Sequence, residues 1–231
     1  MTPAAPIGEP MRNDNGDRVD LERRSALASV WMSWIERIGY EQATGRLRWL
    51  YDRIRGPGGE IDNIMSVHSL RPHTMEGHLA LYKNVLHHTA NRMPTWLLEL
   101  VGVHVSLLNG CEYCVEHHFA GLCRLLHDDT RGPGLRSALE RRDYGAFEPR
   151  EAAVLQYAER LTLSPADMTE PDVGALRDAG LDDGEILEVN QVVAYFAYAN
   201  RTVQGLGVTT RGDVLGLSPP DSDDGAGWGH G

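Results

Sequence analysis

Cysteine is scarce in this sequence, with three residues in 231. An odd, low count with no secretory signal in residues 1–10 argues against a scaffold held together by disulfides. Long hydrophobic runs are missing too, because no stretch reaches the roughly 18 uninterrupted apolar residues of a membrane helix. We therefore expect a cytoplasmic protein with no membrane partner.

Positive charge is also in short supply. The 22 Lys and Arg residues against 33 Asp and Glu residues give a formal net charge of -11. A negative surface repels nucleic acid and anionic lipid, so we expect neither as a partner. The 42% hydrophobic content over 231 residues is ordinary for a globular protein and is enough for one full core.

The signals of a β-sheet are missing as well, since no hairpin turn separates alternating segments and strands do not alternate with helices. Apolar residues instead recur at three- and four-residue steps, as they do on the face of a helix. We predict an all-α fold, a compact helical bundle, with loops at 56–59 and 131–134. Its helices are expected at 21–38, 41–54, 72–92, 95–108, 111–127, 148–163, 169–180 and 182–203.

Both ends of the chain are poor in apolar residues. Residues 1–20 are rich in Pro, Asn, Asp and Gly, and residues 213–231 form an acidic, Gly-rich tail. Such segments cannot bury enough apolar surface to offset their chain entropy. We expect them to be disordered and to flank one all-α domain at 21–212.

Three residues with redox and acid–base chemistry share one face of the helix expected at 111–127. At about 100° per residue, Cys111, Cys114 and His118 lie on neighbouring turns. The helix N-terminus favours a thiolate at Cys111, because its N–H groups and dipole lower a thiol pKa. The imidazole of His118 lies one turn beyond Cys114 and can exchange a proton with a thiol.

Glu99 is the second signal, because it is the only carboxylate in an apolar run from Trp96 to Leu108. A buried carboxylate needs a hydrogen-bond partner or a proton. Asn109 and Gly110 join its helix tightly to the helix of the cysteines, so the two helices should pack side by side. Glu99 is therefore predicted to face the cysteine–histidine face and to complete a proton relay.

Other interpretations of these residues stay open at this stage. The cysteines might be ordinary buried thiols, or Cys-x2-Cys-x3-His might bind zinc, although no second ligand pair follows. Covalent haem attachment needs a His directly after the second Cys, where Val115 stands. Outside the site, we interpret His104 and Cys123 as core residues, His117 as a surface or interface residue, and His78, His87 and His88 as solvated.

The spacing Glu99-x11-Cys111-x2-Cys114-x3-His118 resembles the active-site pattern of the AhpD-like alkylhydroperoxidases in the carboxymuconolactone decarboxylase superfamily. Further segments resemble the branch known as peroxidase-related enzymes, and the likeness spans roughly residues 40–210. These segments are 69–72 (SLRP), 81–83 (LYK), 105–114 (VSLLNGCEYC) and 200–208 (NRTVQGLGV).

The resemblance implies an all-helical fold with the cysteines in a central helical hairpin, no metal or other cofactor, and a homo-oligomer, either a dimer, a trimer or a hexamer. It implies a dithiol–disulfide cycle in which Cys114 attacks a hydroperoxide and Cys111 resolves the product, with His118 and Glu99 as the proton relay. A thiol or dithiol reductant that the sequence does not identify would close the cycle. Some members have a His between the cysteines, where this chain has Tyr113.

Three functions follow from these residues. The first is a thiol-dependent peroxidase acting on alkyl hydroperoxides or hydrogen peroxide. The second is a decarboxylase of carboxymuconolactone type, although such members do not rely on a pair of cysteines. The third is a non-catalytic redox sensor whose dithiol switches assembly without turnover.

Overall fold

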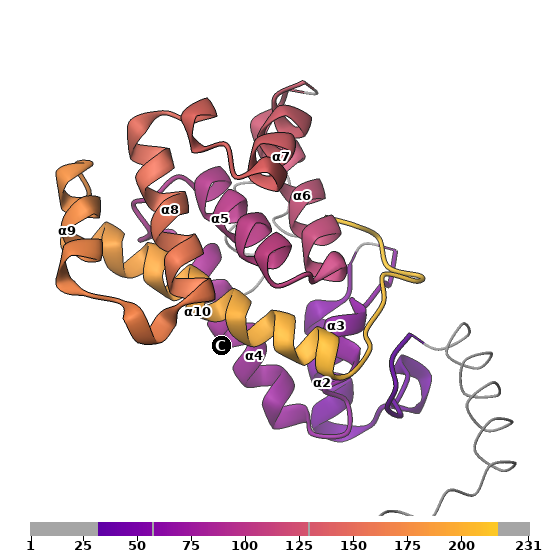
Figure 1. The fold of residues 1–231 in the computed structure, drawn as a ribbon. Helices are drawn as coiled ribbons and strands as arrows, with labels where there is room; N and C mark the ends of the chain where they lie inside the picture. Colours follow the sequence, from indigo (N-terminus) through magenta and orange to yellow (C-terminus); the bar gives the residue numbers. More distant parts are fainter. Residues whose placement is uncertain (1–31, 57, 129, 217–231) are drawn as a thin grey trace, which may run out of the picture.

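The computed structural model describes residues 32–56, 58–128 and 130–216. These residues fold into helices and turns with no β-strand among them, so the predicted all-α class is confirmed. Figure 1 shows the helices gathered into one bundle. Within the described ranges, no helix is long and apolar enough to span a bilayer.

Helix α5 (Thr95–Leu108) forms the centre of the core, and every residue from Leu97 to Ser106 is buried. It packs mainly against α6 (Glu112–Leu126), α8 (Pro149–Leu163) and α10 (Asp183–Gly205). An apolar sequence with no polar face predicts such a position, because each side of the helix needs a partner. Figure 1 shows α10 running between α5 and α8 on one side and α4 (Pro72–Leu86) on the other.

The remaining elements surround this centre. Helices α2 (Gly45–Ile54) and α3 (Asn63–Ser66) lie with α4 at one end of the bundle, and α9 (Glu170–Asp178) packs on α8. Helix α7 (Arg131–Arg141) packs on α6. Three single 3₁₀ turns, η1, η2 and η3, lie at Tyr40–Gln42, Tyr144–Ala146 and Pro165–Asp167.

Several predicted boundaries are wrong. Residues 131–134 begin α7 and do not form a loop, because Pro133 occupies the first turn, where a missing N–H costs nothing. Helix α4 ends at Leu86, six residues earlier than expected. Residues 32–38 are extended or bent, and the rest of the helix expected at 21–38 lies outside the described residues.

The expected disordered segments have different outcomes. Residues 1–20 and 217–231 lie outside the described residues, so those parts stay predictions. Residues 213–216, which we placed in the tail, are described, and the Asp213 carboxylate accepts hydrogen bonds from α3 and α6. These contacts link positions 100 and 150 residues apart and hold Asp213 against the bundle.

Candidate functional site

The turn between α5 and α6 places the first cysteine. Gly110 takes a left-handed conformation with φ of 66°, which a residue without a Cβ adopts at little cost. The Cys111 N–H donates to the Ser106 carbonyl at 2.9 Å, and the Gly110 N–H donates to the Leu107 carbonyl at 3.1 Å. This is a Schellman termination of α5, and it leaves Cys111 as the N-cap residue of α6.

The two cysteines are buried, reduced and in contact, with their sulfur atoms 2.9 Å apart. The hydrogen bond that Cys114 supplies lowers the pKa of Cys111, helped by the Cys114 backbone N–H and the Asn200 amide. The same shared hydrogen bond, together with burial, raises the pKa of Cys114 well above its usual value. Because the two thiols share one hydrogen bond, they lose their protons in coupled steps that belong to the pair.

The predicted contact between Glu99 and His118 is present. Glu99 has no exposed surface, and its Oε2 lies 2.7 Å from Nδ1 of His118. The Phe196 ring packs edge-on against the imidazole, with ring centroids 4.6 Å apart. A carboxylate on one ring nitrogen and an aromatic ring against its face fix the orientation of the imidazole.

A small cavity of about 70 Å³ opens beside these groups. Cys114 and His118 line it, but Cys111 does not. Besides Cys114 and His118, its lining includes Asp62, Gly216, the aromatic or imidazole side chains of Tyr82, Tyr113, Tyr195, His78 and His117, and the apolar side chains of Ile54, Ile64, Met65, Leu79 and Ala199. A space of this size holds a few water molecules or one small reactive group.

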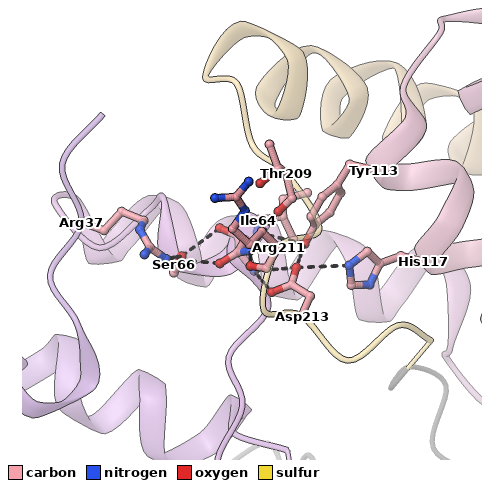
Figure 2. Close-up of polar contacts among 9 residues, drawn as sticks. Arg37, Ile64, Ser66, Tyr113, His117, Thr209, Arg211 and Asp213 are labelled. Atoms are coloured by element: carbon pink, nitrogen blue, oxygen red, sulfur yellow. Dashed lines mark hydrogen bonds and ion pairs between the residues drawn. The ribbon is translucent and has the colours of Figure 1, made fainter. Parts of the chain in front are cut away.

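A second polar cluster lies beside the cavity (Figure 2). The Asp213 carboxylate accepts hydrogen bonds from the Tyr113 hydroxyl at 2.8 Å and from the Asn63 N–H at 3.2 Å. Its Oδ2 also lies 3.2 Å from Nε2 of His117, whose ring stacks on Tyr113. The Ile64 N–H donates to the Tyr113 hydroxyl at 3.1 Å. Tyr113 thus ties α6 to α3 and to Asp213.

Several sequence-based interpretations of single residues need correction. His117, interpreted as a surface or interface residue, is only partly exposed, because its ring pairs with the Asp213 carboxylate. His78 is buried against Tyr195, and His87 lies 3.7 Å from Glu99, so neither is solvated, whereas His88 is exposed. Cys123 is only partly buried, while His104 is a core residue as predicted, hydrogen-bonded to Tyr144 at 2.9 Å.

Sequence reasoning also missed three polar residues of the site. Asn200 is fully buried and its amide donates to the Ser106 hydroxyl at 3.1 Å. Among the buried residues of α10 it is the only one with an amide or charged side chain, a contrast of the kind that singled out Glu99. Asp62 and Asp213 reach the site from distant segments and carry no local signal.

Among the described residues, no group of three or more His, Cys, Asp or Glu side chains is arranged to hold a metal ion. The two sulfurs face each other, and His118 is engaged by Glu99. The zinc interpretation of Cys-x2-Cys-x3-His therefore has no support from the geometry.

No protein-family model matches the sequence, and no curated protein matches it. Solved structures do match. The alkylhydroperoxidase AhpD core of a peroxidase-related protein from Ralstonia eutropha JMP134 is 20% identical, with a TM-score of 0.68 over 78% of this chain and 92% of its own. A peroxidase-related protein from Silicibacter sp. TM1040 is 21% identical, with a TM-score of 0.62 over 76% and 87%.

A third match is a variant of the debrominase Bmp8 in complex with 2,3,4-tribromopyrrole. It is 17% identical, with a TM-score of 0.56 over 77% of this chain and 90% of its own. Identities this low establish the fold and leave the chemistry to the residues of each site. The chain therefore has the AhpD-like fold of these peroxidase-related proteins.

Proposed function

We propose that the protein is a thiol-dependent peroxidase that reduces alkyl hydroperoxides or hydrogen peroxide through Cys111 and Cys114. One observation carries the proposal. Cys114 and His118 line the same small cavity, while the second sulfur lies 2.9 Å behind the first, outside the cavity wall. A nucleophile, a base and a resolving thiol thus meet at a space that fits a peroxide group.

The first chemical step oxidises Cys114. His118 donates its Nδ1–H to Glu99, which leaves Nε2 as the nitrogen that takes the Cys114 proton. The thiolate attacks the outer peroxide oxygen, so that an S–O bond forms and the O–O bond breaks. The sulfur becomes a sulfenic acid, and the alkoxide leaves with the electron pair and takes up a proton to give an alcohol.

The second step closes the disulfide. The Cys111 sulfur attacks the Cys114 sulfenic sulfur, the S–S bond forms, and the departing hydroxide is protonated to water. The Cys111 sulfur suits this role, because it already lies 2.9 Å from the sulfur that it must attack. An external thiol or dithiol returns two electrons by thiol–disulfide exchange.

Turnover with a generic dithiol tests class and site together. We expect the protein to consume cumene hydroperoxide with dithiothreitol as reductant, and Cys114→Ser to abolish the reaction. Cys111→Ser should still consume one equivalent of peroxide but fail to form an intramolecular disulfide. Cys123→Ser is the matched control and should keep full activity, because Cys123 is absent from the cavity lining. Wild-type activity in Cys114→Ser would overturn the role given to Cys114.

A second candidate rests on the aromatic cavity walls formed by Tyr82, Tyr113 and Tyr195. Such walls can contact an aromatic ring whose bromine atom enters the cavity, and the debrominase has a similar fold. In that reaction the thiolate would take bromine from a ring carbon, the carbon would gain a proton, and Cys111 would expel bromide as the disulfide forms. Bromide release from a bromopyrrole without peroxide consumption would favour this second candidate.

A redox sensor, the third function considered from the sequence, would be oxidised once by peroxide and would fail to turn over with any dithiol.

A further inference from the structure

Asp62 stands at the N-cap position of α3, yet its side chain caps nothing. An Asp at this position ordinarily accepts a hydrogen bond from an N–H of the first turn. Here the Asn63 N–H donates to Asp213 and the Ile64 N–H donates to the Tyr113 hydroxyl. Groups from distant parts of the chain therefore do the capping, and the Asp62 carboxyl is released from its usual task.

The released carboxyl lines the cavity of Cys114 and His118. Its Oδ1 is buried, and no described protein group forms a hydrogen bond to that oxygen. A buried polar atom without a partner is unfavourable and calls for an explanation. A ligand in the cavity that exchanges a hydrogen bond or a proton with Asp62 supplies one.

We propose that Asp62 is the acid that protonates the departing alkoxide when Cys114 attacks a hydroperoxide, an assignment that rests on the proposed peroxidase function. The O–O bond breaks as the S–O bond forms, and the alkoxide oxygen accepts the Asp62 proton to leave as the alcohol. The Asp62 carboxylate then recovers its proton from solvent.

The direction in which Cys114 attacks the peroxide gives Asp62 and His118 different roles. Displacement at oxygen needs the sulfur and the two peroxide oxygens nearly in line, with the reacting atoms about 3–3.5 Å apart. The leaving oxygen therefore lies on the far side of the peroxide from Cys114. His118 lies one turn from Cys114 on α6, whereas Asp62 faces the cavity from another segment, at the start of α3.

Burial raises the pKa of Asp62, and the carboxylates of Asp213 and Glu60 reinforce the rise, while His117 and His118 oppose it. Other titratable groups lining the cavity are Cys114 and Tyr113 on α6, His78 and Tyr82 on α4, and Tyr195 on α10. A raised pKa keeps the proton on Asp62 to higher pH. The acid form is lost as the pH rises through that pKa, so the rate should fall there.

The leaving group provides the sharpest test. Alkoxide from tert-butyl hydroperoxide needs a proton to depart, whereas acetate from peracetic acid is stable without one. We expect Asp62→Asn to slow single-turnover oxidation by tert-butyl hydroperoxide by about 10-fold or more and to leave peracetic acid nearly unaffected. It should also remove the fall in rate at high pH. Glu112→Gln is the matched control, because it removes an exposed carboxylate on α6 that does not line the cavity.

Each result decides one of the two proposals. If the wild type reacts with neither oxidant, the peroxidase function fails. If the wild type reacts and Asp62→Asn is unchanged, or is slowed equally with both oxidants, the acid role fails and the peroxidase function stands. Thermal melts establish that the variant is folded, and Asp62→Ala provides a second variant if Asp62→Asn is not.

Discussion

Glu99 shows how one residue orients the site. Its carboxylate is fully buried and bonds Nδ1 of His118, while its other oxygen lies 3.7 Å from His87. We predict that Glu99→Gln slows oxidation of Cys114 by about 10- to 100-fold, because the amide holds the ring but stabilises the imidazolium poorly. Stopped-flow oxidation with cumene hydroperoxide measures this. Glu159→Gln is the control, because it alters another carboxylate, hydrogen-bonded to Tyr144, and should leave the oxidation rate unchanged. Equal oxidation rates for Glu99→Gln and the wild type would contradict a proton relay through Glu99 and His118.

His104 makes stability depend on pH. Burial lowers its pKa from 6.5 to about 4. Above pH 6.5 the His104 imidazole is neutral in both the folded and the unfolded state. Below pH 6.5 the unfolded state binds a proton at His104 before the folded state does, so the free energy of unfolding decreases as the pH is lowered. We expect a loss of about 3 kcal/mol from this residue between pH 6.5 and 4. Urea unfolding at several pH values should show a shallower loss in His104→Gln, and an unchanged slope would refute the assignment.

At the scale of single residues, the sequence predicts a site residue only where its side chain differs in chemistry from its neighbours or recurs at helical spacing. Glu99 is detectable because a lone carboxylate in an apolar helix needs a partner. Cys111, Cys114 and His118 are detectable because helical spacing alone places them on one face. Asp213 contacts a segment 150 residues away, and no local pattern records such a contact. By sequence, Asp62 is an ordinary helix N-cap residue, and only the structure shows that Asp213 and Tyr113 take over its capping role.

At the scale of elements, close packing of α5 against α10 supports the site. A Cβ added at Gly102 would overlap the Phe196 ring, which itself packs on His118. We predict that Gly102→Ala destabilises the fold by about 1–3 kcal/mol and slows Cys114 oxidation. Gly77→Ala on α4 is the matched control: its Cβ would meet nothing, so it should stabilise by about 0.5–1 kcal/mol. Equal effects in urea unfolding would contradict the packing argument.

The C-terminal segment acts as a structural element although it is not helical. Asp213 accepts hydrogen bonds from α3 and α6 (Figure 2). Gly216 lines the cavity. Hydrogen bonds to a charged group contribute about 1.5–3 kcal/mol each. Asp213→Ala should therefore lower the free energy of unfolding by at least about 2 kcal/mol. As a control, Asp178→Ala removes an exposed carboxylate and should change the free energy of unfolding by less than about 0.5 kcal/mol. An equally small change in Asp213→Ala would contradict a stabilising role for the Asp213 hydrogen bonds.

Elements with strong apolar periodicity are predicted well, and α5 matches its expected bounds of 95–108. The failures have local causes. Arg131, Gly132, Pro133 and Gly134 suggest a loop by composition, but Gly132 fits tightly against Cys123, and the proline lies in a first turn. Helix α3 has four residues and is held by contacts with Asp213 and Tyr113, so its own sequence does not specify it.

For the whole molecule, the predicted homo-oligomer remains a proposal. Several large apolar side chains are exposed, among them Trp34 at 70% and Leu187 at 59%. Such residues are common singly, and a set of them suits an interface between copies. We expect light scattering after gel filtration to give a multiple of the 25.6 kDa chain mass. A mass of one chain at micromolar concentration would contradict this expectation.

The peroxidase cycle as a whole depends on the pair of sulfurs 2.9 Å apart beside the cavity. The most direct test counts thiols in the reduced, folded protein before and after one equivalent of cumene hydroperoxide. We predict that three free thiols fall to one, and that peptide mapping finds Cys111 joined to Cys114 with Cys123 still reduced. Three thiols remaining after exposure to the peroxide, in a protein that stays folded, would contradict the proposed function.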